Sequence, residues 1–514
     1  MSESRVHKSL LNAKVNLIFY FLSLFFSFYS RKIFLECLGD NFIGLTGTLG
    51  NILGYLNLAE LGIGSCISFF LYNPLQMGDR AKMQEILSLF GYLYRKIGLF
   101  ILMAGCIVSL AFPWIFNDVQ LGMGIIYFSF FSFLGSSLIG YFINYRQILL
   151  TADQKNYGVV AYFQTGGIIK ALLQIALAYY TRNVYLWVVI ELLFGFINCG
   201  ILNWKINKVY PWLHTDIKQG KQLLKKYPDI FTKTHQIFIH RIKDFILNKS
   251  DEILVFAFVS LKMVAYYGNY LLIINKIILF MNVVSDGMGA GVGNLVAELN
   301  MKNTMKVFWE LTAIRFYVTG VVCFGLFYFT NPLITLWLGS EYLLDNWILY
   351  LLLFNLFVMF TRGVVQMYIH SYGLYADTWS AWFEVIVNLM VTIICASQWG
   401  IIGILLGKVL SSTIIALFWK PYYLYRDGLK LSIFDYWKGM MPHYFLFALG
   451  IALFYPIVHT HILPHIHDFI DLLLYGGGII AIYAIAYIII LYICTTGMRK
   501  FVCRIPIVHN FLRR

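Results

Sequence analysis

Charged side chains are scarce in this sequence of 514 residues, since Asp, Glu, Lys and Arg together make up 12% of it. A water-soluble domain has about a quarter charged residues and is about half apolar, whereas 60% of this chain is hydrophobic. This composition argues against an ordinary soluble fold and favours the lipid bilayer as the natural solvent of the chain.

Ten-residue segments of alternating polar and apolar residues, which are typical of membrane barrels, are also lacking. The apolar runs are instead close to the roughly 20 residues that a helix needs to cross a bilayer. Because backbone groups in lipid must satisfy their hydrogen bonds internally, helices remain as the spanning structure. We therefore predict an all-α integral membrane protein.

Motifs of soluble enzymes and metal proteins are absent as well. The eight cysteines form no CxxC pair, which argues against a disulfide framework or a zinc site. No GxGxxG, P-loop, GxSxG or HExxH motif occurs in a suitable context. Four histidines between His459 and His467 have a spacing that fits no defined metal site. We predict no enzymatic activity, no cofactor and no metal.

About fourteen apolar runs, separated by charged or turn-forming residues, are long enough to span a membrane. We expect the first to be an uncleaved spanning helix, because no small-residue cleavage site follows it, and residues 84–96 to form an interfacial helix. The predicted spans are 14–37, 43–72, 97–116, 121–150, 157–180, 184–204, 238–261, 264–297, 307–330, 345–372, 377–398, 400–424, 439–460 and 469–496.

A long basic loop at 207–236 divides the chain. It separates a predicted six-helix bundle at 1–206 from a second at 237–430, which is followed by helices 13 and 14 with a basic tail at 431–514. A weak internal repeat relates 44–64 to 268–289. Six helices in each block would make the halves parallel repeats, with a site between them.

The basic residues are distributed unequally between alternate loops. The termini and the loops after even-numbered helices hold 25 of the 39 Lys and Arg residues, whereas the opposite loops contain Arg182 and Lys262. Since cytoplasmic loops are enriched in Lys and Arg, we predict that both termini are cytoplasmic. A basic face attracted to anionic membrane lipids explains the net charge of +14 without a nucleic-acid partner.

Ionisable residues within the predicted spans are candidates for function, because a charge in the bilayer costs about 2.5–3.5 kcal/mol or more. Basic side chains facing a cavity would attract an anionic group such as a pyrophosphate and repel a cationic drug. Asp251 could neutralise Lys276 or couple transport to a proton or cation. The basic substrate-binding candidates are Arg31, Lys170, Lys276, Arg362 and Lys408.

Two structural readings stand beside this one. The long basic side chains could reach the interface, or they could pair with acids such as Glu60, Asp286 or Glu384.

Glycines four residues apart can allow close helix approach or serve plain packing. These glycine pairs are Gly50/Gly54, Gly287/Gly291, Gly289/Gly293 and Gly403/Gly407.

Several short segments carry a family resemblance. The sequences RKIFL at 31–35, AELGIG at 59–64 and LYNPL at 71–75 closely resemble the bacterial oligosaccharide flippases of the polysaccharide transporter family. ADQKNY at 152–157, SDEIL at 250–254 and GNLVA at 293–297 are similar to the same family. The resemblance covers roughly residues 14–430.

The resemblance implies a superfamily that also contains multidrug exporters and flippases of lipid-linked peptidoglycan precursors. Its expected fold is MATE-like: two six-helix bundles around a central cavity, with optional helices 13 and 14. The expected activity is alternating-access transfer of an undecaprenyl-pyrophosphate-linked oligosaccharide, for lipopolysaccharide O-antigen or another surface polysaccharide, from the cytoplasmic to the periplasmic leaflet of the inner membrane. Arg31 matches a family position; the other basic candidates rest on depth alone.

The expected partners are the lipid-linked oligosaccharide, membrane lipids, a coupling cation such as H⁺ or Na⁺ and other membrane proteins of polysaccharide assembly. Two alternatives remain. A cation-coupled multidrug exporter of the same fold would need acidic or aromatic cavity residues. A membrane polysaccharide polymerase would be expected to carry a large outward loop with catalytic residues.

Overall fold

The computed structural model describes most of the chain, and the regular structure in the described part is entirely helical. Within that part, 11 helices are long and apolar enough to cross a membrane. The chain is therefore a multi-pass helical membrane protein, as the composition predicts. The described residues are 5–60, 63–117, 119–153, 156–227, 250–285, 292, 295–296, 298, 300–374 and 377–504.

The chain divides into two compact units, Met1–Ala265 (unit 1) and Tyr266–Arg514 (unit 2). The division falls within a helix, and the predicted division into six-helix bundles at the 207–236 loop stays a prediction.

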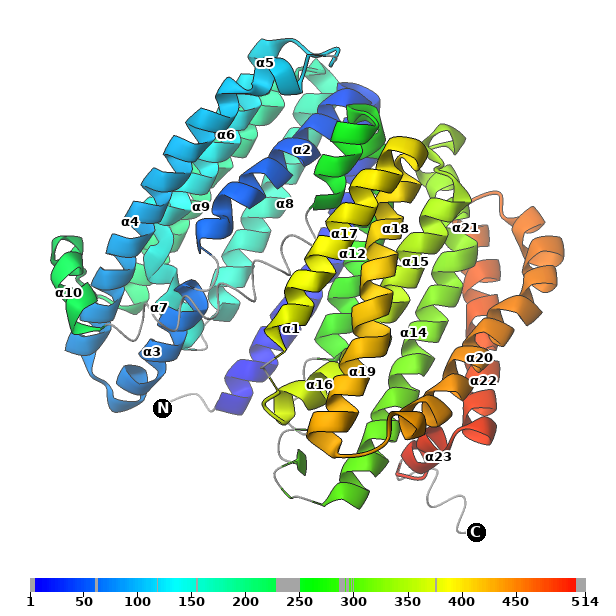
Figure 1. Cartoon of the computed structure of the whole chain (residues 1–514). Coiled ribbons are helices and arrows are strands. Elements are labelled where there is room, and N and C mark those ends of the chain that lie inside the picture. Colours follow the sequence, from blue (N-terminus) through cyan, green and yellow to red (C-terminus); the bar gives the residue numbers. More distant parts are fainter. Residues whose placement is uncertain are drawn as a thin grey trace. The chain divides into compact units, whose positions relative to one another are not determined.

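In unit 1, α6 packs against α4 and α9, and α8 packs against α1 and α9 (Figure 1). Residues 250–258 are also helical. The helices of this unit are α1 (Arg5–Leu38), α2 (Asp40–Leu56), η1 (Asn57–Glu60), α3 (Ile63–Met77), α4 (Arg80–Leu110), α5 (Phe112–Ile115), α6 (Met123–Phe142), η2 (Asn144–Gln147), α7 (Ile148–Ala152), α8 (Asn156–Thr181), α9 (Val184–Val209), η3 (Ile217–Gln219) and α10 (Gly220–Lys226).

In unit 2, α14 packs against α15, α20, α22 and α23, while α18 packs against α15 and α17. The helix α12 (Leu261–Ser285) begins at the end of unit 1. The others are α14 (Met301–Trp337), η4 (Ser340–Tyr342), α15 (Asn346–Thr361), α16 (Gly363–Ser371), α17 (Thr378–Trp399), α18 (Ile401–Ser412), η5 (Thr413–Trp419), α19 (Lys420–Tyr423), η6 (Leu424–Leu429), α20 (Ile433–Ile457), η7 (Val458–Ile462), η8 (Leu463–His465), α21 (Phe469–Asp471), η9 (Leu472–Gly476), α22 (Gly477–Cys494) and α23 (Thr496–Val502).

Some predicted helix boundaries are wrong. The expected interfacial helix at 84–96 is part of the continuous α4, which begins where the Asp79 carboxylate accepts a hydrogen bond from the Lys82 backbone N–H (3.0 Å) and so caps the helix. The predicted helix 43–72 is interrupted after α2 by η1. A regular α-helix begins again at Ile63, the first residue of α3.

The described part of the 207–236 loop folds back onto α4. Lys226 Nζ and the Tyr227 hydroxyl donate to the Glu85 carboxylate at 2.7 and 2.6 Å, and Gly220 lies against the Tyr92 ring. Burial and this carboxylate together raise the pKa of Tyr227. The described part of the loop is therefore held against α4.

An aromatic core joins the last helices to α14. The rings of Phe324 and Tyr483 stack with centroids 3.9 Å apart, and Tyr487 continues the stack at 5.3 Å from Tyr483. Gly450 on α20 makes room for Tyr483, because a Cβ there would lie 3.1 Å from that ring. Predicted helices 13 and 14 are therefore packed parts of unit 2.

Candidate functional site

Lys170 lies between α8 and α9, where the structure gives it an acidic partner. Its Nζ donates to Glu191 Oε1 at 2.7 Å, and each side chain is 27% exposed. Gln174 Nε2 donates to the second oxygen of the same carboxylate at 3.1 Å. Ion pairing with an acid is the structural alternative to substrate binding that was considered for the basic residues. Lys170 forms such a pair, with Glu191, an acid that sequence analysis did not name. Substrate binding by Lys170 stays a prediction.

The substitution Lys170→Met tests whether this pair is structural. It would leave the Glu191 carboxylate in the bilayer without its cation, at an expected cost of about 1–3 kcal/mol, reduced from the fully buried case by partial exposure. Replacing both residues by Met should restore most of the stability, because no charge is then left alone. Thermal unfolding of the detergent-solubilised chain measures both. A single variant as stable as the wild type would contradict a structural pair.

Arg31 and the acids of helix 250–258 are further polar residues of unit 1. Arg31 Nη2 donates to the Ala265 carbonyl at 2.8 Å. Asp251 is buried, with 6% of its surface exposed, and the neighbouring Glu252 accepts a hydrogen bond from Asn51 Nδ2 at 2.6 Å. The structure therefore adds Glu252 and Asn51 to the polar groups within the predicted spans.

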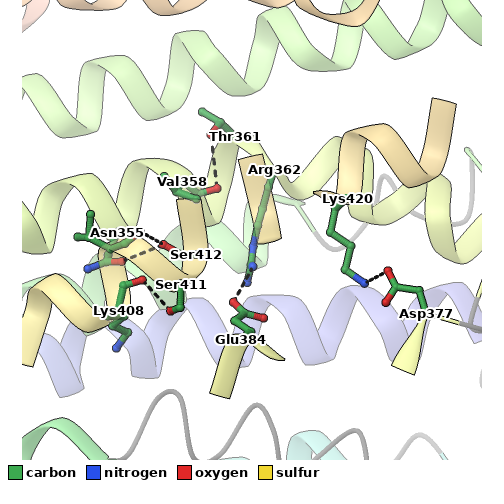
Figure 2. A network of polar contacts seen from close by, with 11 residues as sticks. Asn355, Val358, Thr361, Arg362, Asp377, Glu384, Lys408, Ser411, Ser412 and Lys420 are labelled. Carbon is green, nitrogen blue, oxygen red and sulfur yellow. Dashed lines mark hydrogen bonds and ion pairs between the residues drawn. The ribbon is translucent and has the colours of Figure 1, made fainter. Parts of the chain in front are cut away.

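Arg362 stands at a helix break in unit 2, between α15 and α16. Its guanidinium points toward Glu384 on α17 (Figure 2), with 3.9 Å between Nη1 and Oε1. The Arg362 side chain is 35% exposed, whereas that of Glu384 is 6% exposed. The guanidinium of Arg362 is therefore partly exposed and lies beside a buried acid, at a break between two helices.

Arg315, on α14, is a second arginine at this break that sequence analysis missed. Its Nη1 donates to the Phe360 carbonyl at 3.3 Å. Gly363 permits the approach, since a Cβ there would lie 2.8 Å from the Arg315 guanidinium carbon. Its position near the middle of a long apolar run was the signal available in the sequence.

The remaining basic candidates of unit 2 lie on separate helices. Lys408 is a half-buried residue of α18, and the Ser411 hydroxyl donates to its carbonyl at 3.2 Å (Figure 2). Lys276 is a half-buried residue of α12. Their roles as substrate ligands stay predictions.

Another lysine of unit 2, Lys420, is part of a compact structural network. Its Nζ donates to the Asp377 carboxylate at 2.8 Å, and Trp419 Nε1 donates to the same oxygen at 2.9 Å. Ser380 also donates to Asp377. Three donors around a carboxylate that is 3% exposed satisfy this acid without a ligand.

Metal binding has no obvious location in the described part of the chain, where no group of three His, Cys, Asp or Glu side chains could hold an ion. His459 packs against the ring of Tyr455 at 4.3 Å, and His465 lies 5.8 Å from Tyr475. The candidate acids Glu60 and Asp286 lie outside the described side chains.

Among the described side chains that are buried or half-buried, the balance of charge differs between the units. Unit 1 has the bases Arg31, Arg146, Lys170 and Lys205 and the acids Asp40, Glu85, Asp153, Glu191, Asp251 and Glu252. Unit 2 has the bases Lys276, Lys306, Arg315, Arg362, Lys408 and Lys420 and the acids Glu310, Asp377, Glu384, Asp427 and Asp471. Within this set, bases therefore outnumber acids only in unit 2, and by one.

Unit 1 also contains a cavity of about 380 Å³. It is lined by amides and tyrosines, among them Asn57, Gln147 and Tyr94, and none of the described lining residues carries a charge. None of the predicted site residues lines it. The neutral, polar cavity of unit 1 is therefore chemically different from the basic side chains of unit 2.

Comparison with known proteins places the fold. No protein-family model matches the sequence, and no curated protein matches it. A solved structure of the lipid II flippase MurJ, in an inward closed conformation, is similar with a TM-score of 0.66 and 15% identity, covering 92% of this chain and 98% of that one.

An inward-facing multidrug resistance MATE family transporter of the MOP superfamily is similar with a TM-score of 0.56 and 16% identity, over 81% of this chain and 99% of that one. At such low identity these likenesses establish the fold alone. The predicted MATE-like transporter fold is confirmed.

Proposed function

We propose that this protein is a flippase of the MOP superfamily that moves an undecaprenyl-pyrophosphate-linked oligosaccharide from the cytoplasmic to the periplasmic leaflet of a bacterial inner membrane. The substrate would be the repeat unit of a surface polysaccharide such as O-antigen. The observation that carries the proposal is the likeness in fold to a lipid II flippase, which extends over 92% of this chain and 98% of that one.

The charge balance of unit 2 supports an anionic substrate. Arginine offers a planar fork that binds phosphate oxygens in pairs, and lysine adds a point charge. Arg315 and Arg362 lie at one helix break, so two such forks come from neighbouring helices. We assign these arginines, with Lys276 and Lys408, to the pyrophosphate, and expect the lipid tail to remain in the bilayer.

Transport of this kind works by alternating access, and its energy source is a separate part of the proposal. Asp251 is a buried carboxylate in unit 1, and buried acids in spanning helices serve as proton or cation sites in transporters. We assign Asp251 to coupling with H⁺ or Na⁺. Other membrane proteins of polysaccharide assembly are the expected partners.

A cation-coupled multidrug exporter is the second candidate, because a MATE family transporter has a similar fold and acids outnumber bases among the described buried and half-buried side chains of unit 1. The basic balance of unit 2 argues against it, since a cationic drug would be repelled there. The two similar structures are a flippase and a transporter, so a polysaccharide polymerase has less support.

Deleting the gene in its host distinguishes these functions. A flippase predicts loss of the surface polymer, with complete lipid-linked repeat units accumulating in the inner leaflet. Accumulation in the outer leaflet would identify a polymerase instead. An unchanged polymer together with increased drug sensitivity would contradict the proposal and favour the exporter.

A further inference from the structure

The cavity of unit 1 lies at two interruptions of the helical structure. Its walls come from η1, between α2 and α3, and from η2 and α7, which follow α6. Its volume of about 380 Å³ is within the range of about 300–1,000 Å³ found for small-ligand pockets. The cavity is therefore large enough to hold a ligand group.

The polar groups in this cavity are neutral ones. The amides of Asn57, Asn144 and Gln147 line it together with the hydroxyls of Ser137 and Thr151. Amides and hydroxyls both donate and accept hydrogen bonds, which matches the alcohol and acetamido groups of a sugar. A phosphate or carboxylate would instead be bound by Arg or Lys, and no described lining residue is of either type.

Several of these groups have bonding capacity left over within the described part of the chain. The Asn57 side-chain oxygen accepts from Ser137 (3.4 Å) and that of Asn144 accepts from Asn203 (3.3 Å), so the NH₂ group of each amide has no partner there. The Gln147 amide makes no hydrogen bond with a described residue. Amide groups with unused hydrogen-bonding capacity favour a ligand that can form those hydrogen bonds.

Aromatic rings form another part of the wall. The rings of Tyr94 and Tyr141 lie 5.4 Å apart at an angle of 45°, and Phe90 packs on Tyr94 at 4.1 Å. Aromatic faces offer a flat apolar surface beside a polar rim. A pyranose ring has the same division, with C–H faces and a hydroxyl edge, so the combination of rings and amides selects a saccharide.

We propose that this cavity binds a sugar residue of the lipid-linked oligosaccharide. The inference rests on the proposed function, which supplies the class of substrate. Thr151, which lines the cavity, follows the predicted span 121–150 and so belongs to a loop that is predicted to be cytoplasmic, the side from which such a substrate would be loaded. Arg146, the nearest arginine in sequence, is held away by Asn203 and Asn207 at 2.7 and 3.1 Å.

Gly140 offers a direct way to fill the cavity. It lines the cavity on α6, and a Cβ added there would meet no atom within 4 Å. Gly140→Leu should therefore add an isobutyl group at the cavity wall and reduce the space for the sugar, and Gly140→Ala is the matched control with a single methyl group. Gln147→Leu removes an unpaired amide and gives a second, independent variant.

The measurement is binding of two defined lipids to the full-length chain in nanodiscs: undecaprenyl pyrophosphate alone and the same lipid bearing one N-acetylglucosamine. The wild type and Gly140→Ala should bind the sugar-bearing lipid at least about tenfold more tightly, a ratio that one good polar recognition site supplies. Gly140→Leu and Gln147→Leu should reduce this ratio toward one, with unchanged binding of the sugar-free lipid.

Other outcomes separate the two proposals. Equal wild-type affinity for both lipids, or an unchanged ratio in both variants, would overturn the sugar site and leave the flippase proposal intact. Wild-type protein that binds neither lipid would contradict the proposed function itself. Competition by free N-acetylglucosamine at the same concentration as the lipid-linked sugar would show a site for free sugar and overturn the lipid-linked assignment.

Discussion

Arg362→Gln is expected to lower the rate of lipid-linked oligosaccharide transfer by at least about 30-fold, because truncating one partner of a desolvated charge contact costs about 2–5 kcal/mol. The guanidinium is assigned to the pyrophosphate, and glutamine gives a shorter polar side chain without the charge. Arg426→Gln is the matched control, since Arg426 is a more exposed arginine whose partner is Asp427. It should leave the rate within about twofold of the wild type, as surface pairs contribute little.

Glu384 provides the decisive second substitution. Arg362→Gln alone removes the cation whose Nη1 lies 3.9 Å from this buried carboxylate, so loss of activity in the single variant could reflect destabilisation. The double variant Arg362→Gln/Glu384→Gln removes that cause. It should fold and remain inactive, and recovery of the wild-type rate would show that Arg362 only neutralises Glu384.

Gly407→Leu is expected to abolish accumulation of folded protein in the membrane. Gly407 on α18 faces α17, where a Cβ would lie 2.7 Å from the Asn388 carbonyl oxygen and would also meet the Thr392 hydroxyl. The carbonyl belongs to a helix backbone and cannot rotate away. Gly407→Ala, with the smallest possible side chain, should already cost about 1–3 kcal/mol through overpacking.

Gly200 is the control for this substitution. It is an exposed glycine of α9, and a Cβ there would meet no atom within 4 Å. Gly200→Ala should be neutral or stabilise the helix by up to about 1 kcal/mol. Fluorescence-detected size-exclusion chromatography of the solubilised variants measures the folded fraction. A monodisperse Gly407→Leu protein with the yield of the wild type would contradict the close packing of α17 and α18.

The spans that sequence analysis placed best have local boundary signals. Residues 157–180 were predicted as a helix and α8 is Asn156–Thr181. The next helix begins after Asn183, whose side chain accepts hydrogen bonds from the backbone N–H groups of Tyr185 and Leu186. Such a cap depends on residues within one turn, so it can be read along the chain.

The helix break at Arg362 could not be predicted from neighbouring residues in this way, because Arg315 contacts it from another helix. The partner of Lys170 is also non-local, yet Glu191 lies deep in the adjacent apolar run, and an acid there is a detectable signal. Glycines four residues apart differ in their surroundings: Gly403 and Gly407 do bring helices together, whereas Gly50 faces open space. The neutral cavity is lined by residues of η1, α3, α4, α6, η2 and α7, which no linear pattern brings together.

The central claim, transfer of a lipid-linked oligosaccharide between leaflets, is tested most directly with the purified chain in proteoliposomes. The substrate would be undecaprenyl pyrophosphate bearing a fluorescent saccharide, placed in one leaflet and detected in the other with a membrane-impermeant quencher. We expect rapid transfer by the wild type and transfer near that of empty liposomes by Arg362→Gln/Glu384→Gln. Wild-type transfer no faster than in empty liposomes, with the protein folded and with an ion gradient of either sign, would contradict it.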